Sequence, residues 1–442
     1  MKKIILFVAI AASIFTAGKD TYLSAAFVAE KGNIAMRVDS TSEAFVKGDE
    51  KMPEPIFEKK VIGELINDTG AAKMNTLGCI GDINADGLPD YIVCGRNGEM
   101  AWFENPGRRD KWIKHRIAGI KGQECGGCAF DLTGNGYPDI INGSDYTNDE
   151  MCWWENTGKF GGEWKRRIIA KTGKSQMHDT LIGEIKNDGV KYLVFTNQSG
   201  GTSIFCVPIP DDPYISPWQG LEIIACGLAL PNPDNSAGSQ PEEGLALGDV
   251  DNDGQLELVC GTSYYKWTGA AWEAVRFTGE IYITTKILIA DIDNDGRNEI
   301  ILAEGDAYIY GHDEGCKLAW FKPAGENYKQ EWREHIIDTG LLDAHSLAAA
   351  DLCSNGYCDI FAGEIGAVKR GGGSEDYIIR PPRLIIYEND GKGSFTARHI
   401  IDEGTGIHEA VLTDLDGDGK LDIIGKPLHG GEQWNIHVWY RR

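Results

Sequence analysis

The sequence predicts an all-β fold, a seven-bladed β-propeller closed by an N-terminal strand, and three repeating features support this prediction. The first is a pattern of an apolar run, an acidic loop and a second apolar run, which recurs seven times in 442 residues. Successive loops are about 55 residues apart on average, which accommodates the four short strands of one propeller blade. The loops begin at Asp82, Asp131, Glu184, Asp249, Asp291, Asp351 and Asp414.

The second and third features are the outer strands of the repeat. A third-strand signature reads MAWFENPG (100–107) in the first repeat and LAWFKPAG (318–325) in the fifth, and a fourth-strand pattern follows each. The last repeat ends at its third strand, NIHVWYRR (435–442), whereas IFEKKVIGEL (56–65) matches the fourth-strand pattern. We therefore expect the N-terminal strand to complete the last blade, because this closes the ring and removes an exposed sheet edge.

The N-terminus has the features of a bacterial secretory signal peptide. Lys2 and Lys3 precede an apolar run over residues 4–15, and small residues follow. The run is short for a membrane span, although an uncleaved anchor is the alternative. We expect a secreted or periplasmic protein that consists of a signal peptide (1–18), an N-terminal extension or linker (19–55) and the propeller (56–442).

The charge and the cysteines restrict the possible partners. With 43 Lys and Arg against 67 Asp and Glu, the formal net charge is −24 at pH 7. This surplus of carboxylates argues against a nucleic-acid partner and against binding to anionic membranes. The eleven cysteines are an odd number, so at least one is free or paired between molecules if the others are bridged. Cys353 and Cys358 flank one loop and could pair.

The acidic loops predict structural calcium sites. Their pattern, D-x-[DN]-x-[DN]-G-x-x-[DE], places oxygen ligands at alternate positions of a tight turn and ends with a carboxylate that completes the shell. The alternative is an Asp- and Asn-rich turn that its own side chains hold without a metal. Four loops are complete or nearly so, with the ligands Asp82, Asn84, Asp86 and Asp90; Asp249, Asp251, Asp253 and Glu257; Asp291, Asp293, Asp295 and Glu299; and Asp414, Asp416, Asp418 and Asp422.

A second group of polar residues is expected at the centre of the ring. The position six residues before each acidic loop should lie at the start of an innermost strand, beside the central channel. Three imidazoles and a carboxylate at this position can bind a divalent transition metal or supply a general base with an acid. The alternative is that each histidine caps a strand or bonds a neighbouring backbone group. The seven residues are Thr76, Cys125, His178, Glu243, Thr285, His345 and His408.

Long polar loops between second and third strands are expected at the same face. They supply Tyr308 in the fifth blade and Lys369 and Arg370 in the sixth, while Lys286 adjoins the central position of the fifth blade. Aromatic and cationic side chains around a polar funnel suit a sugar, especially an anionic one.

These repeats resemble the FG-GAP/VCBS-type propellers, which also form the head of integrin α chains, and the resemblance covers residues 56–442. The chain is similar to secreted propeller polysaccharide lyases, namely the rhamnose–glucuronate and rhamnogalacturonan lyases, and to the propeller domain of keto-sugar dehydratases. The resemblance implies a carbohydrate-active enzyme that cleaves uronate-containing glycans by β-elimination. The candidate catalytic residues are His178, His345, His408, Glu243, Lys369, Arg370 and Tyr308.

Other functions remain open at this point. A non-catalytic, calcium-stabilised propeller would present its loops to a glycan or a protein, since the fold serves both binding and catalysis. A glycoside hydrolase would need two carboxylates at a defined separation, for which Glu243 with Glu124 or Glu409 is the candidate. A sugar dehydratase is the remaining option.

Overall fold

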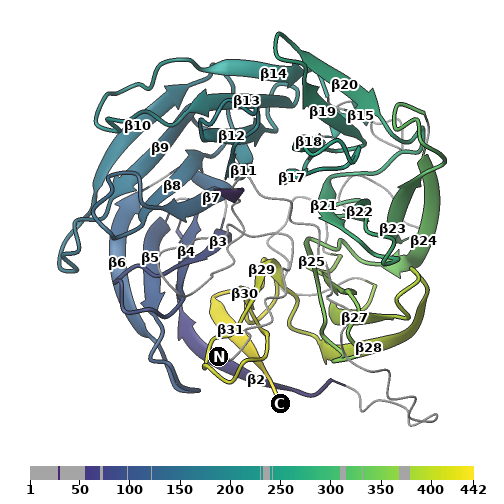
Figure 1. The fold of residues 1–442 in the computed structure, drawn as a ribbon. Helices are drawn as coiled ribbons and strands as arrows, with labels where there is room; N and C mark the ends of the chain where they lie inside the picture. The colour runs from purple at the N-terminus through teal and green to yellow at the C-terminus, as the bar shows by residue number, and fades with distance from the viewer. Residues whose placement is uncertain are drawn as a thin grey trace, which may run out of the picture.

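A ring of seven antiparallel sheets surrounds a central axis in the computed structural model of this protein (Figure 1). The fold therefore confirms the predicted all-β, seven-bladed propeller. No helix in the described part of the chain is long and apolar enough to cross a membrane. The structure describes residues 28–29, 55–69, 73–96, 98–120, 122–228, 230–231, 239–240, 242–308, 315–330, 332–367 and 379–442.

Each blade has four strands, numbered here from the centre of the ring outward. Blade 1 contains β3 (Asn75–Gly81), β4 (Asp90–Gly95), β5 (Gly98–Glu104) and β6 (Ile113–Ile120). Blade 2 contains β7 (Gln123–Phe130), β8 (Asp139–Ser144), β9 (Glu150–Glu155) and β10 (Lys165–Lys171). Blade 3 contains β11 (Met177–Gly183), β12 (Tyr192–Asn197), β13 (Ser203–Pro208) and β14 (Glu222–Cys226).

The remaining blades follow the same order. Blade 4 contains β17 (Ala246–Gly248), β18 (Glu257–Cys260), β19 (Ser263–Trp267) and β20 (Trp272–Arg276). Blade 5 contains β21 (Thr285–Ala290), β22 (Glu299–Glu304), β23 (Cys316–Pro323) and β24 (Trp332–Leu341). Blade 6 contains β25 (Ser346–Ala350), β26 (Asp359–Gly363), β27 (Arg383–Asn389) and β28 (Phe395–Glu403). Blade 7 contains β29 (His408–Thr413), β30 (Asp422–Lys426), β31 (Asn435–Arg441) and β2 (Phe57–Glu64).

The N-terminal strand closes the ring as predicted. Strand β2 pairs antiparallel with β31, so the first described long strand and the last strand of the chain complete one blade (Figure 1). A short strand, β1 (Val28–Ala29), pairs in parallel with β11 at the inner edge of blade 3. It falls within the predicted linker, most of which, like the signal peptide, lies outside the described residues. A hairpin of β15 (Leu230–Pro231) and β16 (Ser239–Gln240) lies between blades 3 and 4 in the chain.

The apolar core lies between neighbouring blades. All seven residues of β3 are buried, including the polar Asn75 and Thr76 at its start, because this innermost strand is covered by its neighbours. Ile80 and Phe103 of blade 1, for example, pack with Val411 and Val438 of blade 7. This packing holds the ring together through side chains from strands that are distant in the sequence.

Buried asparagines join adjacent blades in three places. Asn105, Asn156 and Asn389 each follow the glutamate of a third-strand signature. Each side-chain amide donates to a backbone oxygen in the acidic loop of the preceding blade, at 2.8 to 3.0 Å. The backbone N–H of each also donates to the closing carboxylate of its own loop, at 2.7 to 2.9 Å. The asparagine therefore fixes two loops at once.

Replacing Asn156 with alanine is expected to lower the free energy of unfolding by about 2 kcal/mol, because one buried and one partly buried backbone oxygen lose their donor. The lost bonds run to Ile83 O (2.9 Å) and Pro138 O (3.0 Å). Urea denaturation of both variants measures the change. Asn327→Ala is the control, since Asn327 is exposed and should change stability by about 0.5 kcal/mol or less. Equal losses in the two variants would contradict the assigned role of Asn156.

Candidate functional site at the centre of the ring

Three histidines and one glutamate from four blades meet at the centre of the ring. His178 belongs to β11 and His408 begins β29. His345 directly precedes β25, and Glu243 lies three residues before β17. The imidazole centroids of His345 and His408 are stacked 4.2 Å apart, and those of His178 and His345 lie 5.9 Å apart, edge to face. The structure therefore brings together four of the seven candidate catalytic residues.

The donor atoms of this group are close enough to bind a single ion. One donor each from His178, Glu243 and His345 lies within 4.8 Å of the others. Glu243 Oε2 is 3.6 Å from His178 Nδ1 and 3.9 Å from His345 Nε2. Among the described residues, this oxygen and His345 Nδ1 are buried without a hydrogen-bond partner. Two imidazoles and a carboxylate fit a divalent transition metal, and they also fit an acid–base pair.

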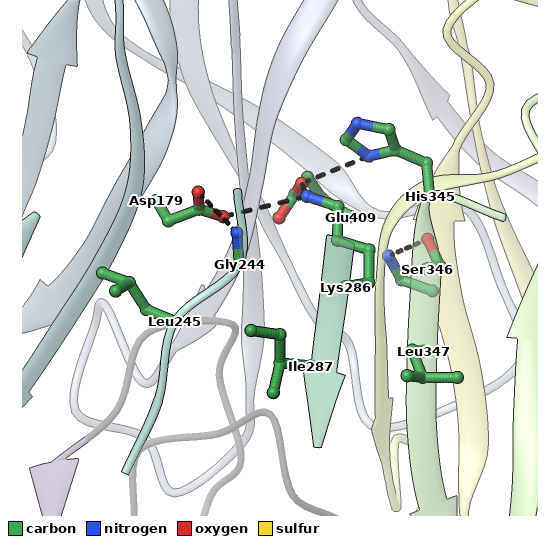
Figure 2. Close-up of a pocket in the computed structure, with 10 residues that line it drawn as sticks. Asp179, Gly244, Leu245, Lys286, Ile287, His345, Ser346, Leu347 and Glu409 are labelled. Atoms are coloured by element: carbon green, nitrogen blue, oxygen red, sulfur yellow. Dashed lines mark hydrogen bonds and ion pairs between the residues drawn. The ribbon is translucent and has the colours of Figure 1, made fainter. Parts of the chain in front are cut away.

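A small cavity lies beside this cluster, and residues from five blades line it (Figure 2). Asp179, Lys286, His345 and Glu409 turn their polar groups toward one another at one end, whereas the other end is apolar (Figure 2). Lys286 Nζ lies 3.5 Å from Glu409 Oε1 and 3.8 Å from Asp179 Oδ1. The cavity volume of ≈ 70 Å³ holds about five water molecules or the carboxylate end of a sugar.

Two of the histidines are held neutral. Burial and the nearby Lys286 ammonium lower the pKa of His345 below its ordinary value. Burial and the Lys426 ammonium lower the pKa of His408 further, and Lys426 Nζ lies 3.2 Å from His408 Nδ1. Neutral imidazoles can accept a proton or a metal, so both residues are chemically available at neutral pH.

In contrast, His178 and Glu243 favour their protonated forms. Burial alone would lower the pKa of His178, but Cys125, Glu243 and Asp179 outweigh burial and raise this pKa well above 6.5. Burial raises the pKa of Glu243, although the positive charge of His178 opposes this shift. The pair therefore retains a proton at neutral pH, next to two imidazoles that do not.

Asp306 is a member of this site that sequence analysis missed. Its Oδ2 lies 3.7 Å from His345 Nε2, and its backbone N–H donates to Thr284 Oγ1 at 2.5 Å. Gln198 was missed too, and its side-chain amide donates to Glu243 Oε1. Both residues follow the second strand of their blade. Because first and second strands are antiparallel neighbours, the end of one meets the start of the other, and that rule could have identified them.

The remaining candidates are not among the described residues of this cluster. Tyr308 follows β22, and its backbone N–H donates to Asp343 Oδ1 at 2.8 Å. Its phenol makes no hydrogen bond to another described residue. Lys369 and Arg370 lie outside the described residues, so their relation to the cavity stays a prediction.

The acidic loops form turns with internal hydrogen bonds. In blades 1, 4 and 5 the first aspartate accepts two backbone N–H groups from its own loop, at 2.9 to 3.1 Å. Other loop oxygens in blades 4 and 5 are buried without a hydrogen-bond partner among the described residues: Asp251 Oδ1, Glu257 Oε1, Asp293 Oδ1 and Glu299 Oε1. Such oxygens fit a cation.

In blade 4 a lysine side chain enters the loop. Lys266 Nζ lies 2.5 Å from Asp251 Oδ2, 2.6 Å from Asp253 Oδ2 and 3.4 Å from Glu257 Oε1. Burial alone would lower the pKa of Lys266, but its bonds to the two aspartates outweigh burial and raise it. The ammonium group therefore supplies positive charge where calcium was predicted.

Two further loops contain a side-chain cation. In blade 5, Lys322 contacts the three carboxylates that correspond to those around Lys266. In blade 7, Arg109 forms ion pairs with Asp416 and Asp418. Within the described part of the chain, no Lys or Arg forms an ion pair with the blade 1 loop (82–90). Calcium would have to displace a side chain in blades 4, 5 and 7, but not in blade 1.

The predicted pairing of Cys353 with Cys358 is wrong, because all eleven cysteines are free. Cys353 packs into the core shared with blade 7, whereas Cys358 packs into the core shared with blade 5. The two thiols thus point to opposite faces of blade 6.

Seven four-stranded blades with an N-terminal closing strand define this protein as a seven-bladed β-propeller with a polar centre. Two segments, residues 82–141 and 371–425, match the family model described as the FG-GAP-like repeat. The comparison with curated proteins found no match.

Solved structures with a similar fold include proteins of different kinds. BBS1N in complex with ARL6DN has a TM-score of 0.47 at 7% identity, over 88% of this chain and 97% of that one. The BP39L lectin from Burkholderia pseudomallei has a TM-score of 0.44 at 11% identity, over 88% and 97%. The rhamnogalacturonan lyase YesW has a TM-score of 0.43 at 12% identity, over 87% and 75%. This likeness concerns the fold and assigns no activity.

Proposed function

We propose that this protein is a secreted or periplasmic carbohydrate-active enzyme, a lyase that cleaves uronate-containing poly- or oligosaccharides by β-elimination. One observation carries the proposal: the neutral imidazole of His345 and the cationic Lys286 line the same small cavity. Elimination requires a cation that neutralises the uronate carboxylate, a base that removes the C5 proton, and an acid that protonates the leaving oxygen at C4.

The geometry suggests a role for each group. Lys286, which lies 3.5 Å from Glu409 and 3.8 Å from Asp179, would exchange these partners for the carboxylate of the substrate. His345 Nδ1, which lacks a hydrogen-bond partner among the described residues, accepts the C5 proton, while Asp306 near Nε2 stabilises the resulting imidazolium. His178, whose pKa is raised, is the candidate acid that returns a proton to the leaving oxygen.

A glycoside hydrolase is supported less well. It needs two carboxylates free to act on the sugar. Glu124 is fully buried and its Oε2 accepts a bond from Arg96 Nε at 2.7 Å, while Glu409 pairs with Lys286. Glu243 is therefore left without a suitable second carboxylate from the original candidates.

The partner and the ions form a second part of the proposal. We propose an anionic glycan as the substrate and a structural calcium ion in the blade 1 loop, with which no Lys or Arg among the described residues forms an ion pair. Asp82, Asn84, Asp86 and Asp90 would supply the oxygens.

Incubation of the purified protein with a panel of uronate glycans tests the proposed function, because each elimination creates an unsaturated uronate that absorbs in the ultraviolet. We expect absorbance to rise, and to rise far more slowly for Lys286→Met, since the substrate carboxylate then stays unneutralised. Activity that chelation abolishes, and that a transition metal but not calcium restores, would assign His178, Glu243 and His345 to a divalent ion instead. A flat trace from folded protein on every glycan would favour a binding propeller.

A further inference from the structure

Blade 6 contains a group of metal-ligating side chains that is separate from the central histidine cluster. Cys353 lies in the acidic loop, Glu388 in β27 and His399 in β28. One donor atom from each lies within 4.8 Å of the others. His399 Nε2 is 2.9 Å from Glu388 Oε2, and the Cys353 side chain is buried. Thiolate, imidazole and carboxylate are the three ligand types that zinc takes in proteins.

Blade 1 contains the same Glu–His pair but no thiol beside it. Glu104 and His115 form the corresponding pair there, on the same two strands and 2.7 Å apart. The loop position that corresponds to Cys353 is occupied by Asn84 in blade 1. The Glu–His pair is thus present in both blade 1 and blade 6, whereas the thiol beside it is present in blade 6 and not in blade 1.

We propose that Cys353, Glu388 and His399 bind one zinc ion that ties the acidic loop of blade 6 to its two outer strands. A tetrahedral zinc ion holds its ligand atoms roughly 3–4 Å apart, so small side-chain shifts suffice, and a water molecule takes the fourth position. On binding, the thiol of Cys353 releases its proton to solvent and the sulfur becomes a thiolate ligand.

The local charge favours a cation at this place. A second carboxylate lies beside the group, because Asp359 Oδ2 accepts the backbone N–H of Cys353 at 2.7 Å. Arg441 binds other atoms of the same loop: its Nη2 donates to Ser354 Oγ at 2.7 Å and its Nη1 to Asp351 O at 3.2 Å.

Cobalt(II) titration of the metal-stripped full-length protein tests this site independently of any enzymatic activity. Cys226 is the exposed cysteine, and its replacement by serine provides a clean background. We expect saturable cobalt binding with a thiolate-to-cobalt charge-transfer band that zinc displaces. Cys353→Ser should abolish the band, and His399→Ala should weaken binding by about tenfold or more.

Matched controls come from the same protein. Cys358→Ser removes a buried thiol from the same loop, and His115→Ala breaks the corresponding pair in blade 1. Both should keep the band and the affinity, and zinc should raise the melting temperature of both by more than that of Cys353→Ser. A band absent from the starting protein, or one that persists in folded Cys353→Ser, would overturn the proposal.

Discussion

Replacing His345 with alanine is expected to lower kcat for β-elimination by about 10²- to 10⁴-fold, the range that positioned general bases contribute. His345 lines the cavity, its pKa is lowered, and Nδ1 has no hydrogen-bond partner among the described residues. KM should change much less than kcat, because the carboxylate of the substrate is held by Lys286 rather than by His345. Initial rates on the glycan that responds in the panel measure both constants.

His335→Ala is the matched control for this variant. His335 lies in the outermost strand of blade 5 and stacks on Trp320 with a centroid distance of 4.0 Å. Its removal deletes an imidazole without touching the cavity, so activity should be retained. Asp306→Asn should have an intermediate effect, since it leaves His345 in place but removes the carboxylate near Nε2. Unchanged kcat in folded His345→Ala would rule out His345 as the base.

The second large effect is expected from Lys266→Met combined with Lys322→Met. Each change leaves a buried glutamate and two aspartates without their cation, which should cost about 2 kcal/mol of unfolding free energy per loop. Burial already raises the pKa of Glu257 and of Glu299 to about 8, and loss of the ammonium raises it further, so protonation of the glutamates relieves part of the cost. Denaturation in chelator measures the loss.

Calcium should restore part of the stability of this double variant, because it can enter loops that the ammonium groups have left. The starting protein should gain less, since calcium must there displace both lysines. Lys329→Met is the control: Lys329 forms an exposed pair with Glu273 at 2.6 Å, and such surface pairs contribute about 1 kcal/mol or less. A starting protein that gains as much from calcium as the double variant would show that the lysines do not occupy the sites.

Much of the fold could be predicted from the sequence, because the repeat identifies the residues that occupy equivalent positions in the seven blades. The loops give the number of blades, and the unmatched strands at 56–65 and 435–442 give the closure. The same equivalence predicts that His178, His345 and His408 share one position, and in the structure they lie at the centre of the ring. The repeat suffices for these inferences, since it places equivalent positions of each blade at the same distance from the central axis.

Contacts between different strands are determined by the tertiary structure. Asp306 joins the central group through the end of a second strand, and Lys266 enters an acidic loop from a third strand. Cys353 meets His399 rather than Cys358 because the direction of each side chain depends on the register and twist of its blade. The sequence by itself therefore determines the ring and its central residues. The direction and length of each side chain decide which charged groups meet within a blade. The repeat pattern does not predict these contacts.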